Sequence, residues 1–169
     1  MWVFDATPLI YLGKAAALTH LSAIESPRFI PERVYDEVVT AGLDYEYPDA
    51  RRIEQQVERG TFEVVSVEET TLFTRLQRNP NLSEVDVAVL VLAAEHNATA
   101  VMDEQYGRDV AATEEIPTRG TAYLLLSLIK ENEITADEAR KYIDAMLDAG
   151  WYCAPNLYAQ IIAKLDTLS

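Results

Sequence analysis

The stretch Trp2-Val3-Phe4-Asp5 and a later stretch of the same kind, Thr99-Ala100-Val101-Met102-Asp103, decide the fold expected for this chain. Both are short runs without charge that end on an aspartate. A run that is apolar on both alternating faces is typical of a central strand in a parallel sheet that helices cover on each side. In open α/β sheets, ligands bind outside the carboxyl ends of the strands. We therefore expect Asp5 and Asp103 to lie at the same edge of the sheet.

Segments with strand and helix patterns alternate along the rest of the chain. The predicted strands besides these two are residues 28–30, 62–67 (an outer strand) and 116–118 (a brief edge strand). The predicted helices are residues 8–25, 32–41, 48–59, 68–77, 83–96, a short helix after 108, and 122–129, 135–147 and 156–168. Thr7 is the expected N-cap of the first helix, and Gly42 is the expected end of the second. This alternation predicts the α/β class with a mainly parallel sheet.

Length and composition fit one globular domain. The chain has 169 residues, of which 49% are hydrophobic and 25% are charged. No apolar run approaches the roughly 20 residues of a membrane span, and no basic-then-apolar leader is present. We therefore expect a cytoplasmic protein that does not enter a membrane.

Cysteine and histidine are too scarce for thiolate or typical zinc chemistry. Cys153 is the one cysteine, so an internal disulfide is excluded, and the two histidines, His20 and His96, have no ligand-like neighbours. Any metal ion would have to be bound by carboxylates. That favours Mg²⁺ or Mn²⁺, which prefer oxygen ligands.

The charge balance is strongly acidic. Asp and Glu number 28 against 14 Lys and Arg, which gives a net charge of −14. Such a surface suits high internal salt, where the Debye length falls to about 3 Å at 1 M, and indicates a halophile-like source. An acidic surface selected for basic partners is the alternative. In either case, nucleic acid could be handled only through local basic patches, bound metal or strong screening.

Four acids stand out by their context. Asp5 and Asp103 end strands, Glu37 borders the apolar face of a helix, and Asp86 lies in the first turn of an otherwise apolar helix. We expect each to be partly buried, where a carboxylate is costly unless it is paired or bound to metal. Four carboxylates at one edge would repel each other unless a divalent cation neutralised them. Such an ion could activate water for attack on phosphorus.

Each acid also has an ordinary structural alternative. Asp86 follows Ser83 by three residues and could simply complete a capping box, and Asp5 could simply cap the helix after it. Asp103 could begin a turn, and Glu37 taken alone is more often a solvated helix residue. Lys14, taken alone, is a surface lysine. The acids indicate a metal site only as a set.

The ordered motifs resemble those of the PIN-domain nucleases, in the branch related to toxins of type II toxin–antitoxin pairs. The motifs, which cover about residues 1–130, are Asp5-Ala6-Thr7, Val34-Tyr35-Asp36-Glu37-Val38, Leu82-Ser83-Glu84-Val85-Asp86, Met102-Asp103-Glu104 with Gly107-Arg108, and Arg119-Gly120-Thr121 before an apolar helix. The resemblance implies a three-layer α/β/α sandwich and a ribonuclease that depends on Mg²⁺ or Mn²⁺.

Carried over residue by residue, the resemblance makes Asp5, Glu37, Asp86 and Asp103 the metal-binding catalytic acids. Thr7 would support Asp5 through its hydroxyl. Glu84 competes with Asp86 for the third position, and the context favours Asp86. Glu104 is a candidate accessory ligand, and Arg108 is a weaker supporting candidate. The helices of residues 131–169 are expected to pack on the nuclease domain of residues 1–130 as an extension. Implied partners are RNA, a small antitoxin and a second copy in a homodimer.

Two other hypotheses remain open. One is a PIN-like RNA- or protein-binding scaffold without catalysis, which the acidity favours because no dense basic patch is visible. Dispersal of the arginines over the surface would support it; these are Arg51, Arg52, Arg59, Arg75, Arg78, Arg108 and Arg119. The other is a phosphatase with an aspartate nucleophile. That chemistry usually needs Asp-x-Asp after the first strand, and Thr7 stands where the second aspartate would be.

Overall fold

Five parallel strands form one sheet in the order β3-β2-β1-β4-β5 in the computed structural model, which describes residues 1–169. The strands are β1 (Trp2–Phe4), β2 (Arg28–Pro31), β3 (Glu63–Val65), β4 (Thr99–Val101) and β5 (Thr118–Arg119). All four pairings are parallel. The predicted α/β class and the outer position of β3 are confirmed.

Strand β1 lies at the centre of the sheet. Phe4 is in register with Val101 of β4, and the Asp5 N–H donates to the Val101 carbonyl over 3.1 Å. Val3 and Phe4 are fully buried. The uncharged run was therefore correctly interpreted as a central strand, and Asp5 comes directly at its carboxyl end.

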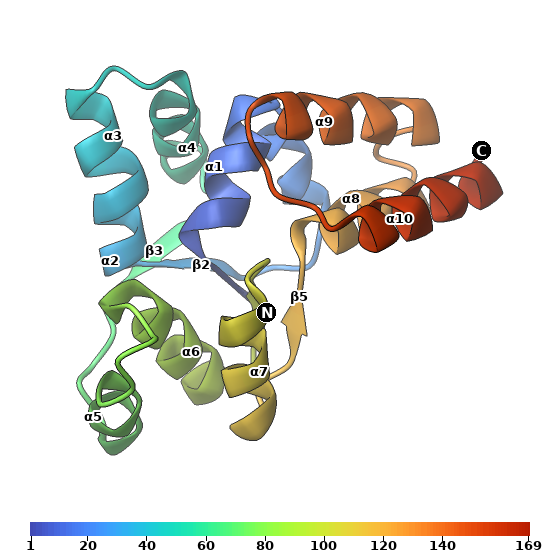
Figure 1. Ribbon diagram of the computed structural model, residues 1–169. Coiled ribbons are helices and arrows are strands. Elements are labelled where there is room, and N and C mark those ends of the chain that lie inside the picture. The colour runs from blue at the N-terminus through green and yellow to red at the C-terminus, as the bar shows by residue number, and fades with distance from the viewer.

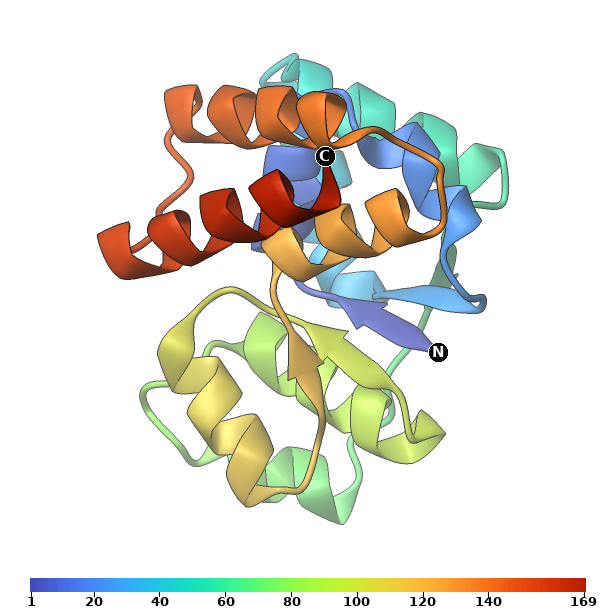
Figure 2. The ribbon, with the colours of Figure 1, turned by 90° about the vertical axis from the view of Figure 1, so that its right-hand side faces the viewer.

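Helices cover both faces of this sheet and make three layers (Figures 1 and 2). Along one face lie α5 (Thr71–Gln77), α6 (Glu84–His96) and α7 (Gln105–Thr113). On the other side lie α1 (Ala6–Lys14), the 3₁₀ helix η1 (Leu18–Ala23), α4 (Pro48–Glu58), α8 (Thr121–Lys130), α9 (Ala136–Asp148) and α10 (Pro155–Leu168). The helical stretch after β2 comprises α2 (Glu32–Tyr35), the π-helical η2 (Asp36–Thr40) and α3 (Ala41–Asp44). None of the helices is both long and apolar enough to span a bilayer.

Three local predictions for the first half of the chain were wrong. The N-cap of α1 is Asp5, not Thr7, because the Asp5 carboxylate accepts from the Ala6 N–H. The first helix also stops at Lys14, before Ala16 takes a left-handed φ of 59°. Gly42 does not end the helical stretch after β2. It lies inside α3 against α4, where an added Cβ would be 2.7 Å from the Ala50 Cβ, so this glycine serves close helix packing.

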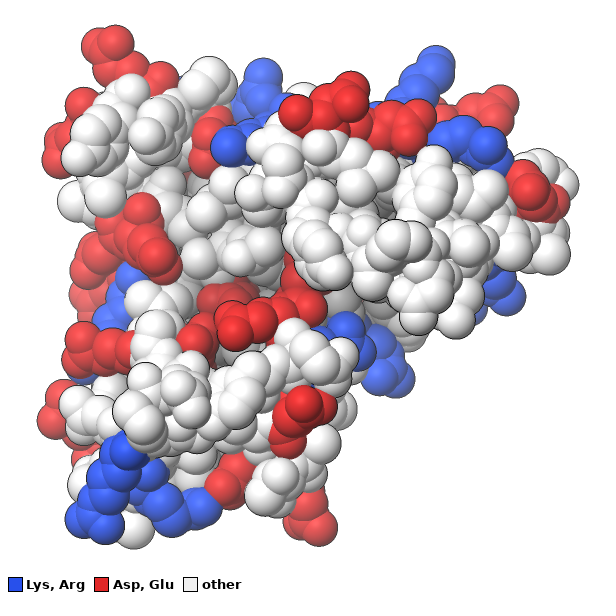
Figure 3. Space-filling view, viewed as in Figure 1, with Lys and Arg blue, Asp and Glu red and all other residues white.

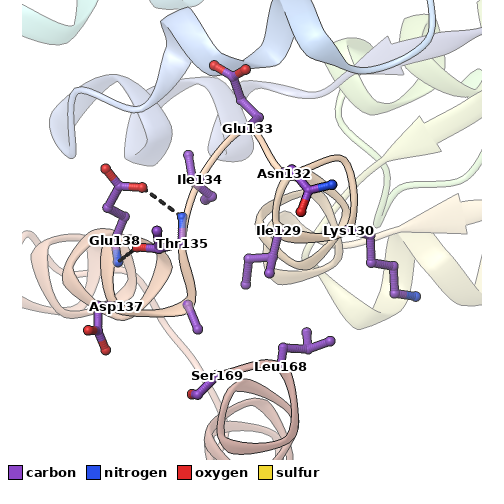
Figure 4. A pocket seen from close by; sticks show the side chains of 11 residues that line it. Ile129, Lys130, Asn132, Glu133, Ile134, Thr135, Asp137, Glu138, Leu168 and Ser169 are labelled. Atoms are coloured by element: carbon purple, nitrogen blue, oxygen red, sulfur yellow. Dashed lines mark hydrogen bonds between the residues drawn. The ribbon is translucent and has the colours of Figure 1, made fainter.

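The C-terminal helices share the main hydrophobic core. Trp151, Ile161 and Leu165 are buried in the same cluster as the sheet residues, and α9 contacts α1 and α8. The predicted capping box of α9 is present, with hydrogen bonds between Thr135 and Glu138 in both directions (Figure 4). The hollow beside it, of about 660 Å³, lies between the end of α8, the start of α9 and the end of α10. None of the four predicted site acids lines it.

Candidate active site

Asp5 is the buried centre of the candidate site. Its residue surface is only 7% exposed, and its Oδ1 accepts from the Ala6 N–H over 2.8 Å. Burial raises the pKa of Asp5 from 3.8 to about 7; the Ala6 N–H opposes that rise, and the charges of Asp86, Glu37 and Asp103 add to it. The structure therefore brings all three other acids into the electrostatic field of Asp5.

The topology explains why the four acids meet. Asp5 and Asp103 follow the neighbouring parallel strands β1 and β4, whose carboxyl ends lie at the same edge. Helix α6 leads into β4, so its N-terminal turn, which carries Asp86, lies at that edge as well. Glu37 comes from the helical stretch that follows β2 on the other side of β1. Figure 3 shows acidic atoms lining a hollow between the helices above and below the sheet edge.

Three donors hold the Asp103 carboxylate in place. The Thr121 N–H donates to Oδ1 over 2.8 Å, and the Thr121 hydroxyl donates to Oδ2 over 2.7 Å. The Trp151 indole N–H also donates to Oδ2, over 3.1 Å. Asp103 therefore does more than begin a turn: it is a fixed carboxylate whose donors come from α8 and from the α9–α10 connection.

The sequence named Thr121 only within the motif Arg119-Gly120-Thr121, and it gave neither Thr121 nor Trp151 a role in holding an acid. Thr121 could have been found, because it follows β5 directly and so lies at the same edge as Asp103. Trp151 had no local signal. It lies 48 residues from Asp103, and only the packing of the C-terminal helices brings the two together.

Gly120 leaves room beside Asp103. An added Cβ there would lie 3.1 Å from Asp103 Oδ1 and 3.3 Å from Arg108 Nη1. The space that Gly120 leaves is therefore bordered by one carboxylate and one guanidinium. Arg108 forms no ion pair with any acid, so its charge is available at this edge.

The structure separates the two competing acids of α6. Asp86 completes the capping box with Ser83, at 3.0 Å for each of the two hydrogen bonds, and its charge also acts on Asp5. Glu84 is exposed and pairs with Arg33 at 3.5 Å. This geometry supports the preference for Asp86. The capping role is real, and it leaves one carboxylate oxygen, Oδ1, without a hydrogen bond.

The remaining predicted residues lie at the periphery. Glu37 is exposed, so its expected partial burial was wrong: η2 turns this residue outward at the sheet edge. Short π-helical segments are frequent at functional sites. Thr7 is half-buried in the first turn of α1. Glu104 is exposed just before α7 and makes no side-chain cap hydrogen bond.

The donor set suits a hard divalent cation. Asp5, Glu37, Asp86 and Asp103 form no ion pair with any Lys or Arg, so nothing in the chain neutralises them directly. Carboxylate-only ligands favour Mg²⁺ or Mn²⁺. As placed, no three Asp, Glu, His or Cys side chains converge into a ready-made metal cage. An ion would therefore have to draw the carboxylates inward.

The three-layer fold defines an α/β sandwich with an acidic carboxyl edge of its sheet. The sequence model of the PIN-domain family matches residues 1–167, and this chain belongs to that family. PIN domains are in general nucleases, and they typically use divalent metal ions. Comparison with curated proteins and with solved structures gives no match. The family match runs through the C-terminal helices, beyond the motifs on which the resemblance was based.

Proposed function

We propose that this protein is a Mg²⁺- or Mn²⁺-dependent endoribonuclease that hydrolyses RNA phosphodiesters at the carboxyl edge of its sheet. One observation carries the proposal: Asp5 is buried at the end of β1, in the field of three further carboxylates, and no basic side chain pairs with any of the four. Such an arrangement is costly unless a cation occupies it.

Asp5, Asp86 and Asp103 would hold the ion, with Glu37 at the solvent side. A bound divalent ion supplies an activated water and stabilises charge that develops on the phosphate. The chain orients Asp103 through Thr121 and Trp151, so the other carboxylates would make most of the movement toward an ion. Asp5, with a pKa raised to about 7 by burial and by its acidic neighbours, gives up its proton near neutral pH.

Hydrolysis through a covalent intermediate has no support here. Burial raises the pKa of the Cys153 thiol, which keeps it neutral and poorly nucleophilic. His20 is engaged by Glu133 and Tyr142, and the ring of His96 packs against Phe29. Direct attack by water is therefore the mechanism that these residues favour.

The resemblance to toxins of type II toxin–antitoxin pairs suggests the biological role. We propose that the protein acts as such a toxin, and the segment Arg119-Gly120-Thr121 before α8 supports this branch. Induced expression should then arrest growth for wild type and not for Asp103→Asn. Equal growth of both strains, with cleavage intact in vitro, would favour an RNA-processing nuclease instead.

The arginines favour a second candidate, the PIN-like scaffold without catalysis. They lie on α4 and α5 or directly after these helices, on α7 and on β5, and Figure 3 shows basic atoms in separate groups. Arg52 donates to the Gly13 carbonyl, and Arg75 pairs with Glu114. On the face that Figure 3 shows, the basic groups do not join, so this face offers RNA only local positive charge.

One assay separates the two candidates. Purified protein is incubated with structured and single-stranded RNA in high salt, with Mn²⁺, with Mg²⁺ or with EDTA, and calorimetry measures divalent-ion binding. The nuclease cuts RNA with either ion and not in EDTA. Absence of cleavage together with absence of ion binding would overturn the nuclease and favour the scaffold.

A further inference from the structure

A groove of about 680 Å³ begins at the candidate site and runs between α8 and α10. Asp103 forms part of its lining, so the groove is continuous with the acid cluster. Its opposite wall is the segment from Trp151 into α10. Volumes of this order are typical of sites for small ligands, and a single nucleotide falls within that range.

Two acids, Asp103 and Glu104, and two arginines that form no ion pair line the groove. Arg108 and Arg119 both line it, and neither forms an ion pair. Arg119 donates to the Thr118 carbonyl, and its guanidinium lies 4.9 Å from the centre of the Tyr123 ring. Because neither guanidinium is paired with an acid of the chain, each can bind a phosphate of an occupant, although the protein as a whole has a net charge of −14.

Aromatic surface is exposed on both walls. Tyr123 on α8 is 41% exposed, and Tyr152 before α10 is 81% exposed. Leu126 and Leu157 add apolar surface, and Gln160 contributes an amide that makes no hydrogen bond within the chain. Aromatic and arginine planes of this kind bind unpaired bases by stacking, largely without regard to sequence.

We propose that this groove seats a nucleotide of single-stranded RNA next to the phosphate that is cut, with its base against Tyr123 or Tyr152 and its phosphate near Arg108 or Arg119. The inference rests on the proposed function, because it takes RNA as the substrate. It adds where the chain holds a base beside the site, and it requires an unpaired strand there, since a base inside a duplex presents no free face for stacking. The two unpaired arginines distinguish this occupant from an apolar peptide helix.

Cys153 provides an intrinsic reporter, because it lines the groove and is the only cysteine of the chain. Its raised pKa makes alkylation slow, so the rate of reaction with N-ethylmaleimide is followed by intact mass at mildly alkaline pH. The Asp5→Asn protein with Mg²⁺ is used so that bound RNA is not cut. Four nucleic acids are tested for their ability to protect Cys153 from alkylation. They are an eight-nucleotide single-stranded RNA, the same strand with abasic sites, a duplex RNA and a single-stranded DNA. The unpaired RNA should slow alkylation severalfold, and the abasic and duplex forms should not.

Variants of the groove test the stacking directly. Tyr152→Ala and Arg119→Gln should weaken RNA protection about tenfold, within the range measured for loss of one base–aromatic stack. Tyr45→Ala and Arg59→Gln are matched controls. Tyr45 is 70% exposed, Arg59 is exposed as well, and neither lines the groove.

Failure of this proposal is distinguishable from failure of the nuclease. If wild type cuts RNA while no single strand protects Cys153, the groove assignment is overturned and the nuclease stands. Equal protection by abasic and intact strands would overturn the proposal that a base binds in the groove. The same conclusion would follow if RNA protected Cys153 equally well in the groove variants and in their control variants. Protection by unpaired RNA without cleavage would support the groove and overturn the nuclease. Equal protection by RNA and DNA strands would support base seating while removing its selectivity for RNA.

Discussion

The indole N–H of Trp151 donates to Oδ2 of Asp103 over 3.1 Å, and this contact joins the α9–α10 connection to the end of β4. Trp151 is 5% exposed and Asp103 is half-buried, so the hydrogen bond is partly shielded from water. The C-terminal helices therefore do more than cover the core. They supply one of the three donors that fix a candidate catalytic carboxylate, and Trp151 acts as a positioning residue.

Trp151→Phe keeps the buried ring and removes the donor to Asp103. Loss of a hydrogen bond to a charged group costs about 1.5–3 kcal/mol, so the melting temperature should fall. Single-turnover cleavage should slow about tenfold with little change in KM, because a loosened carboxylate affects the reacting state more than binding. The control is Trp2→Phe, because the Trp2 indole N–H is buried without a partner. Equal cleavage by wild type and Trp151→Phe would contradict the positioning role.

Thr121→Val removes the hydroxyl donor to Asp103 and keeps the side-chain shape. Thr61→Val is its matched control, since the buried Thr61 hydroxyl donates to Gln56 over 2.8 Å, away from the acids. Both substitutions should lower the free energy of unfolding by about 1–3 kcal/mol. Only Thr121→Val should also lower the cleavage rate, as measured under saturating metal. A parallel loss of activity in both variants would mean that stability alone explains the effect.

Asp86→Asn separates helix capping from catalysis. The amide oxygen can still accept from the Ser83 N–H, so unfolding should change little, while the charge near Asp5 is lost. We expect cleavage to fall at least a hundredfold and affinity for Mn²⁺ to fall in calorimetry. Glu138→Gln makes the same change in the capping box of α9, and it should leave both the cleavage rate and the affinity for Mn²⁺ unchanged. Full activity of Asp86→Asn would show that Asp86 only caps helix α6 and has no catalytic role.

Asp5 should make stability depend on pH in the absence of metal. Its pKa is about 7 in the folded chain, raised above 3.8 first by burial, so the folded state binds the proton more tightly than the unfolded state. Stability in EDTA should therefore fall as pH rises between these two values, by at most about 4 kcal/mol. Asp5→Asn should remove this contribution and raise the melting temperature at pH 7.5. Chemical denaturation across pH measures both effects, and a less stable Asp5→Asn protein would contradict them.

Metal ions should reverse that pH trend. Only the ionised Asp5 carboxylate binds a cation, so the stabilisation that Mn²⁺ gives should increase as pH rises through about 7. Asp5→Asn should abolish most of it. The measurement is the shift in melting temperature between Mn²⁺ and EDTA at each pH. A shift independent of pH and of Asp5 would place the ion elsewhere.

The sequence predicted those features that strand ends and periodicity determine. The uncharged runs before Asp5 and Asp103 and the apolar residues of α6 are local signals, and the sheet, its central strands and the meeting of the acids follow from them. The exposure of Glu37 agrees with its alternative interpretation as a solvated helix residue; the partial burial expected from the neighbouring apolar face was wrong. Gly42 was taken for a helix end because its packing partner, Ala50, lies on another helix. The homodimer and the antitoxin remain predictions.

The central claim is that a divalent ion held by these acids cuts RNA. The most direct test is single-turnover cleavage of a single-stranded RNA at high salt by wild type and by Asp103→Asn, each with Mn²⁺ and with EDTA. In Asp103→Asn the amide oxygen can replace Oδ2 and accept from the Thr121 hydroxyl and the Trp151 indole, but the amide NH2 would then face the Thr121 N–H. The melting temperature of the variant is therefore measured alongside, to show that it folds. We predict cleavage by wild type in Mn²⁺ alone and a loss of at least a hundredfold in Asp103→Asn. Equal cleavage by the two proteins, or cleavage that persists in EDTA, would contradict the account.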